Sequence, residues 1–424
     1  FTAGIDFTQY FKNRLYYIDV KGMLSSLHGS AGAITALQNS VAHYYQRASS
    51  ADYLGVDPTR RSLTGTGGYV KVGRKGNAKW NFSETFTWSS PGFDLNDMGY
   101  MKETDYLMNE TEIMYRQTDI WKIFRYNAFT LSQKNMWNYG GTPFSNNASL
   151  RWQSMTMNRY EWDVKETFAW NWLDSRLLRG GPDVRFGSYF LTSAKFNTDK
   201  AKRMMFMLKY EGDHNFEGNR FNTISPSLTF RLGNHVYLSG QLDYAWNTDE
   251  MQYVATTSPL SSSSLAPYYY VMGHMDQKTY GLTLKLQVNV TPDISIQFYG
   301  APFTSIAKYD DFKLAADTKS HTFENRFQRI DPDHLTYVDG VYTIGEGAGQ
   351  MPFRNPDFRF NEFRSNLVAR WEYLPGSTLY FVWEHRMSNR DNWYSSGWGS
   401  NLDRMWGLPA TNTFMIKMNY WFNL

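Results

Sequence analysis

Histidine and acidic side chains are the first candidates for chemistry in this sequence. Its 424 residues include eight histidines, and none has a partner at a metal-binding spacing such as His-x-x-x-His. These histidines are His28, His43, His214, His235, His274, His321, His334 and His385. The sequence therefore predicts no zinc site, and we expect neither a metal nor an organic cofactor.

Two short clusters place histidine beside a carboxylate, which is a pairing used in general acid–base catalysis. Asp331 and Asp333 precede His334, and Glu384 precedes His385. Adjacent residues on a β-strand point to opposite faces, so Glu384 and His385 are badly placed to act together. We therefore predict no catalytic residue and no enzyme activity. A hydrolase with its site at the rim of the fold remains the second alternative.

The segment 307–361 is rich in aspartate and too long for a plain connection. Six of its aspartates are Asp310, Asp311, Asp317, Asp331, Asp333 and Asp339. Calcium prefers carboxylate oxygens, but the spacing matches no EF-hand loop. The sequence favours a solvated loop, which can fold into the polar interior, over a calcium site. A run of four serines at 261–264 predicts the tip of another loop.

Tryptophan clusters offer flat faces on which sugar rings could stack. Trp162, Trp170 and Trp172 share their parity along the chain with Val164 and Phe168. That parity predicts an apolar face and an aromatic girdle instead of a sugar site. Three tryptophans of the last predicted loop are better placed for contact with a sugar or a protein partner: Trp393, Trp398 and Trp406.

The elements that carry these residues are predicted from strict alternation of apolar and polar side chains. Between Leu282 and Val290, every even position is Leu or Val, and the odd positions are Thr, Lys, Gln and Asn. The chain ends on a similar strand, Phe414 to Leu424, which resembles the signal read by the outer-membrane insertion machinery. Alternation over nine or more residues exceeds the usual strand of a soluble sheet. It matches a tilted strand that crosses a bilayer.

We therefore predict an all-β protein, a transmembrane antiparallel β-barrel of the outer membrane, as one domain over residues 1–424. About 17 strands are expected in this chain and 18 or more in the whole protein, because bacterial single-chain barrels usually have an even number. Short turns alternate with long outer loops at about 27–62, 90–107, 307–361 and 389–410.

Composition supports this class of protein and excludes others. Mean hydropathy is −0.54, yet 17% of the residues are Phe, Trp or Tyr. That combination is expected where alternate side chains face lipid and rings gather at the two interfaces. No apolar run is long enough for a transmembrane helix. The net charge of +3 suggests no nucleic-acid partner. Cysteine is absent, and no signal peptide opens the sequence, so we expect it to begin inside a longer precursor.

Two long motifs resemble a known outer-membrane family that is described only as a domain of unknown function. They read SPGFDLNDMGY at 90–100 and NPDFRFNEFRSNLVARWEYLPGST at 355–378. Shorter likenesses are Tyr45-Gln-Arg, Asp57-Pro58 and the stretch TPDISIQ at 291–297. In that family a carbohydrate-binding, family-nine-like domain often precedes the barrel. The resemblance implies further strands and such a domain before Phe1, but it carries over no functional residue.

The function predicted from these observations is transport or porin-like passage of a solute, with carbohydrate weakly favoured. The alternative is a non-conducting accessory barrel in a multi-protein outer-membrane complex. Its partners would be lipid, lipopolysaccharide, the insertion machinery and possible protein subunits. Arg370 and Glu372 share the polar face with Asn366 and could pair there, either in a solvated ladder or, less favoured, in a selectivity ring. No substrate-binding residue is predicted.

Overall fold

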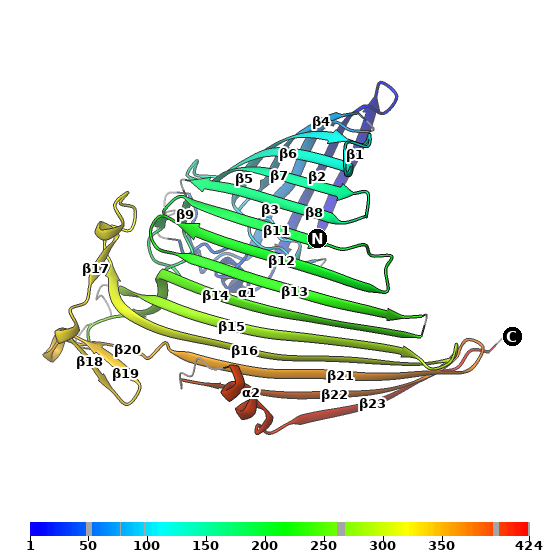
Figure 1. The fold of residues 1–424 in the computed structure, drawn as a ribbon. Helices are drawn as coiled ribbons and strands as arrows, with labels where there is room; N and C mark the ends of the chain where they lie inside the picture. Colours follow the sequence, from blue (N-terminus) through cyan, green and yellow to red (C-terminus); the bar gives the residue numbers. More distant parts are fainter. Residues whose placement is uncertain are drawn as a thin grey trace.

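A computed structural model describes residues 1–47, 53–76, 78–96, 99–170, 172–233, 235–260, 268–392 and 398–422. Its long strands follow one another along the chain and pair antiparallel in a single curled sheet (Figure 1). No helix in these ranges is long and apolar enough to cross a membrane.

Within these ranges, seventeen strands form an up-and-down meander, each paired with the next. They are β1 (Thr2–Phe11), β2 (Tyr16–His28), β3 (Ser62–Arg74), β4 (Trp80–Ser89), β5 (Tyr106–Gln117), β6 (Phe124–Trp137), β7 (Pro143–Thr156), β8 (Glu161–Trp170), β11 (Tyr189–Asn197), β12 (Met204–Asn215), β13 (Arg220–Leu232), β14 (Val236–Thr257), β15 (Tyr269–Asn289), β16 (Ile294–Ala315), β21 (Phe358–Leu374), β22 (Ser377–Asp391) and β23 (Thr411–Asn419). An eighteenth, β17 (Phe327–Arg329), pairs only with the end of β16. The predicted all-β fold and strand number are confirmed.

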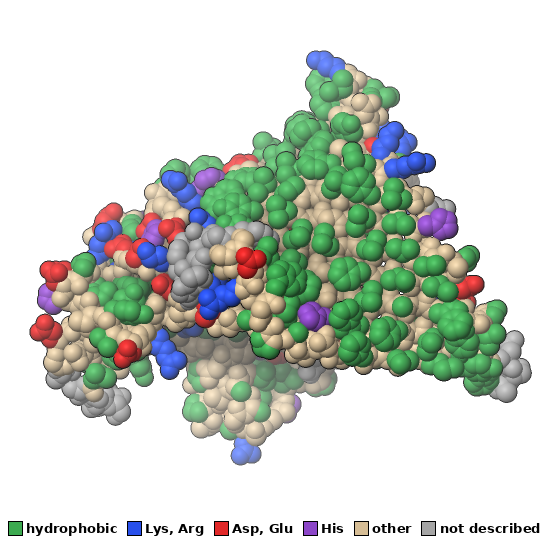
Figure 2. Space-filling view, turned by 60° about the horizontal axis from the view of Figure 1, so that its bottom comes forward, with side chains coloured by type: hydrophobic (Ala, Val, Ile, Leu, Met, Phe, Trp, Pro, Cys, Tyr) green, Lys and Arg blue, Asp and Glu red, His purple; other side chains and the backbone are tan. Residues whose placement is uncertain are grey.

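The sheet has one apolar and one polar face, as the alternation predicts. Leu286 lies opposite Leu238 on β14 and Phe298 on β16, whereas Lys285 lies opposite Ser239 and Tyr299. Apolar side chains of the first face stay open to the surroundings, and Leu150 is 56% exposed. Hydrophobic side chains gather over this face in Figure 2, while charged ones gather at one end of the strands. We call the two sides the apolar face and the polar face.

The two ends of the strands differ in how the chain turns. At one end, short hairpin turns join β1 to β2 and each later pair, and several use a left-handed backbone. Asn13 has φ 55°, Arg159 has φ 61° and Gly376 has φ 80°. Glycine adopts this conformation without strain, which suits Pro375-Gly376 to the turn between β21 and β22. At the other end lie the longer connections.

Smaller elements fill those connections. They are α1 (Ala31–Gln38), β9 (Trp172–Asp174), β10 (Val184–Phe186), η3 (Phe323–Arg326), η4 (Pro332–His334), β18 (Leu335–Val338), β19 (Val341–Ile344), η5 (Gly347–Gly349), β20 (Met351–Arg354) and α2 (Trp398–Trp406). β18 to β20 form a separate three-stranded sheet beyond the end of β16. The segment expected as one loop at 307–361 therefore contains the end of β16, four further short strands, three short helices and the start of β21.

The buried hydrophobic core lies at this long-loop end. One cluster joins the extended ends of β15 and β16 to the small sheet, through Val271, Phe312, Ile344 and Phe353. Another joins the 171–188 connection to β14, β15 and β17. The loops are thus anchored by apolar burial, the main stabilising term in folding.

Strands β1 and β23 form the two edges of the sheet. Among the described residues, β1 pairs only with β2, and β23 only with β22. Figure 1 shows the sheet curling through a wide arc, open between these two strands.

Candidate functional site

The polar face carries closely paired charges along several strands. Arg151 donates to Asp163 across β7 and β8, with Nε 2.7 Å from Oδ1. Arg370 and Glu372 on β21 pair at 2.5 Å, as their shared parity predicts. Asn366 lies on the same face, and its Oδ1 atom is buried without a hydrogen-bond partner in the described residues.

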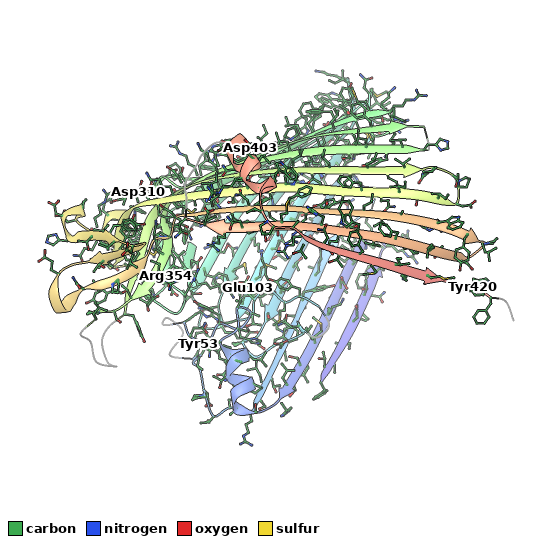
Figure 3. The ribbon with its side chains drawn as sticks, turned by 90° about the horizontal axis from the view of Figure 1, so that it is seen from below. Tyr53, Glu103, Asp310, Arg354, Asp403 and Tyr420 are labelled. Carbon is green, nitrogen blue, oxygen red and sulfur yellow. The ribbon has the colours of Figure 1, made fainter. Side chains whose placement is uncertain are left out.

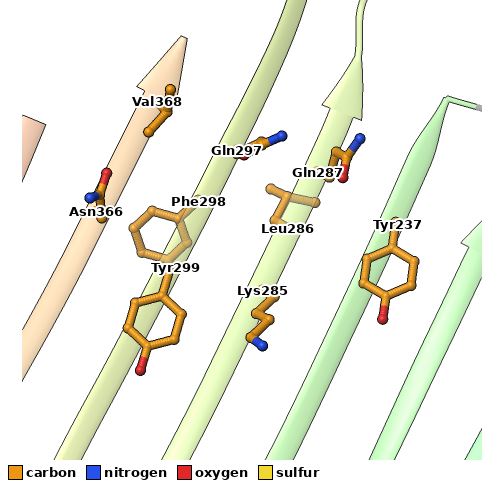
Figure 4. Close-up of a pocket in the computed structure, with 9 residues that line it drawn as sticks. All are labelled: Tyr237, Lys285, Leu286, Gln287, Gln297, Phe298, Tyr299, Asn366 and Val368. Atoms are coloured by element: carbon orange, nitrogen blue, oxygen red, sulfur yellow. The ribbon is translucent and has the colours of Figure 1, made fainter. Parts of the chain in front are cut away.

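A pocket of about 440 Å³ lies on β14, β15, β16 and β21 (Figure 4). Tyr237 and Tyr299 flank Lys285, and three amides complete the polar lining: those of Gln287, Gln297 and Asn366. No carboxylate of the described chain lies within 4.0 Å of Lys285 Nζ. Both tyrosines are more than a third exposed. The pocket therefore offers a cation, two hydroxyls and three amides to a solute, beside two ring faces.

The connection that contains α1 folds back onto the polar face of β2 and β3 (Figure 3). Ser30 begins α1 by accepting a hydrogen bond from the Ala33 amide. Ile34 and Tyr45 then pack against Leu63 of β3, and all three are at most 2% exposed. Burial raises the pKa of Tyr45 to about 12. Tyr45 belongs to the Tyr45-Gln-Arg motif, so that motif has a packing role.

The next connection, between β4 and β5, lies on glycines of β3. A Cβ atom built on Gly65 would be 2.1 Å from the Phe93 amide nitrogen, and one on Gly67 would meet the Phe93 ring. Only glycine permits such a close backbone approach. The Asp94 amide donates to Ser25 Oγ of β2 at 2.8 Å. The Ser90-Pro-Gly-Phe motif therefore fixes this loop to the polar face.

A buried ion pair joins these two connections. Arg47 and Asp105 lie 2.9 Å apart, and their side chains are 7% and 0% exposed. Asp105 also accepts hydrogen bonds from the Tyr53 hydroxyl at 2.7 Å and from the Tyr139 amide at 3.1 Å. Burial raises the pKa of Asp105, while the Tyr53 hydrogen bond and the Arg47 charge act in the opposite direction. Burial also raises the pKa of Tyr53.

A third connection, 171–188, closes on the first two. The Tyr44 hydroxyl donates to the Arg176 carbonyl, and the Arg176 side chain pairs with Glu103 at 3.5 Å. We call the described residues of these three connections (29–47, 53–61, 90–96, 99–105 and 172–188) the loop layer. Farther along, Arg326 is 1% exposed and makes two hydrogen bonds to Glu217, of 2.7 and 2.9 Å.

A second cavity, of about 430 Å³, lies between the loop layer and the polar face of β6, β7 and β11. Charged groups of both signs line it, with a tyrosine at one side: Arg47, Asp105, Lys134, Arg176, Asp183 and Tyr189. The sequence alone did not single out these residues, since they come from five separate segments. Only the Tyr45-Gln-Arg motif contained one of them.

The candidate catalytic clusters have structural contacts. Asp331 accepts a hydrogen bond from the Asp333 amide and so begins η4, while His334 lies 3.9 Å away in an exposed position. Glu384 lies opposite Asn366 on the polar face. His385 points to the apolar face, where it hydrogen bonds to Asn412 at 2.8 Å. Within the described ranges, no three His, Asp or Glu side chains gather as metal ligands do.

Trp162 and Trp170, two of the tryptophans expected in the girdle, lie on the apolar face of β8. Trp162 contacts Phe196, with ring centroids 4.4 Å apart, and Trp170 stacks on Phe168. Trp406 of α2 packs on Phe363, which lies on the apolar face of β21. The side chains of Trp172, Trp393 and Trp398, and residues 261–264, lie outside the described residues. Trp162 and Trp170 therefore lie on the apolar face, as their positions along the strand predict.

Comparison with known proteins gives the family of this chain. No curated protein sequence matches it. Among solved structures, it is similar to the siderophore receptor PirA from Acinetobacter baumannii, with TM-score 0.40 and 10% identity over 98% of this chain and 70% of that chain. The family model described as "Domain of unknown function (DUF5916)" matches residues 29–424. The chain therefore belongs to the DUF5916 family.

Proposed function

We propose that this chain forms the wall and the outer gate of a transport protein in the outer membrane of a Gram-negative bacterium. The apolar face, with rings toward both strand ends, suits a bilayer, and the polar face suits an aqueous passage. The observation that carries the proposal is the loop layer, which lies on the polar face and encloses a solute-sized cavity. A loop held by a few contacts over a polar passage acts as a gate when those contacts open.

The solute class that fits best is a small hydroxyl-rich molecule, and carbohydrate is favoured. Tyr237 and Tyr299 present ring faces, on which the C–H faces of a sugar can stack. Lys285, Gln297 and Asn366 present donors and acceptors for hydroxyl groups. The mixed charges of the second cavity offer the same kind of contact nearer the outside.

A disulfide across the loop layer tests the gate. The natural chain has no cysteine, so Ser25→Cys with Asp94→Cys introduces one defined pair. In the full-length protein in planar bilayers, oxidation should hold the loop closed and suppress conductance, and reduction should restore it. Ser25→Cys alone is the control and should not respond to oxidation. Equal conductance of the oxidised and reduced double variant would refute the gate.

Lys285 should select among solutes in the pocket of Figure 4. Lys285→Gln removes a charge that contributes about 1 kcal/mol near water, so binding of an acidic sugar should weaken about fivefold. Binding of a neutral sugar of the same size should change much less. Blockade of single-channel current by the two sugars measures both affinities. An equal loss for both sugars would assign Lys285 a packing role.

A further inference from the structure

A nine-residue pattern occurs twice in this chain and places a glutamate at the centre of the apolar face each time. Residues 80–88 read WNFSETFTW and residues 162–170 read WDVKETFAW. Both Trp positions and the central Glu-Thr-Phe coincide. The first copy is on β4 and the second on β8, so the sheet repeats one arrangement four strands apart.

Alternate residues of a strand share one face, and this places each glutamate among apolar side chains. On β4, Trp80, Phe82, Phe86 and Trp88 share a face with Glu84, which is the middle of the five positions. Phe82 and Phe86 are 46% and 44% exposed, as expected for side chains that face outward. On β8 the corresponding neighbours of Glu166 are Trp162, Val164, Phe168 and Trp170.

The two glutamates also make equivalent contacts. Thr111 of β5 donates to Glu84 Oε2 at 2.6 Å, and Thr192 of β11 donates to Glu166 Oε2 at 2.7 Å. In each copy the Phe and the final Trp stack, at 6.5 and 5.7 Å between ring centroids. The repeat therefore extends from the sequence to hydrogen bonds and ring packing.

Polar and small side chains lead from Glu84 toward the second copy, while Glu166 itself lies opposite Leu150 of β7. Thr111 lies opposite Gln133 of β6, and Gln133 lies opposite Ala148 of β7. Ala148 lies opposite Phe168, two residues along β8 from Glu166. Strand spacing of about 4.8 Å puts Glu84 and Glu166 about 19 Å apart across the sheet. We call this band, Glu84, Thr111, Gln133, Ala148, Glu166 and Thr192, the acidic strip.

Lipid is a poor neighbour for the acidic strip. A carboxylate at mid-depth loses its hydration, and hydrocarbon offers nothing in exchange. Each threonine supplies one hydrogen bond, but a carboxylate accepts several. On the apolar face of β4 to β8, the described residues place no Lys or Arg between the two rows of rings. The chain itself therefore leaves this negative charge unbalanced.

We infer that the acidic strip is the docking surface for a membrane-embedded protein that presents basic or amide side chains. Charge complementarity selects the partner, because two carboxylates and an exposed glutamine call for hydrogen-bond donors. A second copy of this chain docked strip to strip would bring carboxylate against carboxylate, which costs free energy. Small Ala148 lets a partner approach the backbone between the two glutamates, as small residues do in membrane interfaces. The inference rests on the membrane location proposed above, but not on solute passage.

The test uses the full-length protein in its native outer membrane, with a photo-crosslinking amino acid at Gln133. Leu284, on the apolar face of β15 and 40% exposed, is the matched control position. Gln133 should give an adduct with a discrete second protein, whose crosslinked peptide carries Lys, Arg, Asn or Gln. Leu284 should give lipid adducts alone. Glu84→Gln with Glu166→Gln keeps both threonine contacts, and should lower the Gln133 adduct at least about tenfold, as loss of a buried charge pair does.

Three results would overturn the inference. They are lipid adducts alone at Gln133, an adduct with a second copy of this chain, and an adduct that persists when both carboxylates are removed. Single-channel conductance of the double glutamine variant separates this surface from the gate, since a docking defect should leave conductance unchanged. A protein that gives the Gln133 adduct but conducts no current would instead refute the transport proposal alone.

Discussion

Arg47→Ala is expected to open the loop layer at least about a hundredfold more often than in the natural protein. It leaves Asp105 buried without its guanidinium partner, and breaking a buried pair in this way costs about 3–5 kcal/mol. Each 1.4 kcal/mol changes an equilibrium about tenfold. Hydrogen exchange at the Thr104 amide, which donates to the Ala42 carbonyl at 3.0 Å, reports this opening directly.

The defect should depend on pH in a defined direction. Burial already raises the pKa of Asp105, and loss of Arg47 raises it further. A carboxyl with a raised pKa in the closed state binds a proton there before it does so in the open state. The free-energy cost of burying the unpaired Asp105 carboxylate is therefore largest at neutral pH. It disappears as the pH falls through the raised pKa, because the carboxyl group then becomes neutral. Protection of the Thr104 amide, corrected for intrinsic exchange, should recover on acidification.

Arg47→Ala combined with Asp105→Asn is the control for this prediction. It has no buried charge, so much of the protection should return at neutral pH. If the Thr104 amide loses equal protection in the single and double variants, Arg47 acts by packing. If the Thr104 amide keeps its protection in the single variant, the Arg47–Asp105 pair does not hold the loop layer closed.

Gly65→Val is expected to detach the 90–105 connection from β3. The new Cβ atom would lie 2.1 Å from the Phe93 nitrogen and 2.4 Å from the Gly92 carbonyl carbon. Both contacts are with backbone, so no change of rotamer relieves them. Overpacking costs about 1–3 kcal/mol even where side chains can adjust. We expect protection of the Asp94 amide to fall more than about tenfold, and single-channel conductance to rise.

Gly240→Ala is the matched control. It lies on the apolar face of β14, and its Cβ atom would meet only Leu284 Cδ2, at an ordinary 3.5 Å. It should change neither the Asp94 amide nor the conductance. Normal protection and conductance in Gly65→Val would show that the loop can shift while still closing the passage.

The alternation of side chains along each strand predicts correctly which face of the sheet a residue lies on. A strand repeats its side-chain direction every two residues, so Lys285 and Asn366 could be assigned to the polar face directly. The contacts of the loop layer depend on which distant segments meet. Nothing near Gly65 in the chain indicates that Phe93 will rest on it, and Arg47 and Asp105 are joined only through the fold. Glu84 and Glu166 differ in this respect, because the repeat that contains them is visible in the sequence alone.

The strand count has a geometric consequence for the open side of the sheet. Strands alternate in direction, so the first and seventeenth, β1 and β23, run the same way. Direct contact between them would make a parallel pair. A fully antiparallel ring needs an odd number of strands between them. At about 4.8 Å per strand, the opening then has discrete widths, about 10 Å for one inserted strand and about 19 Å for three.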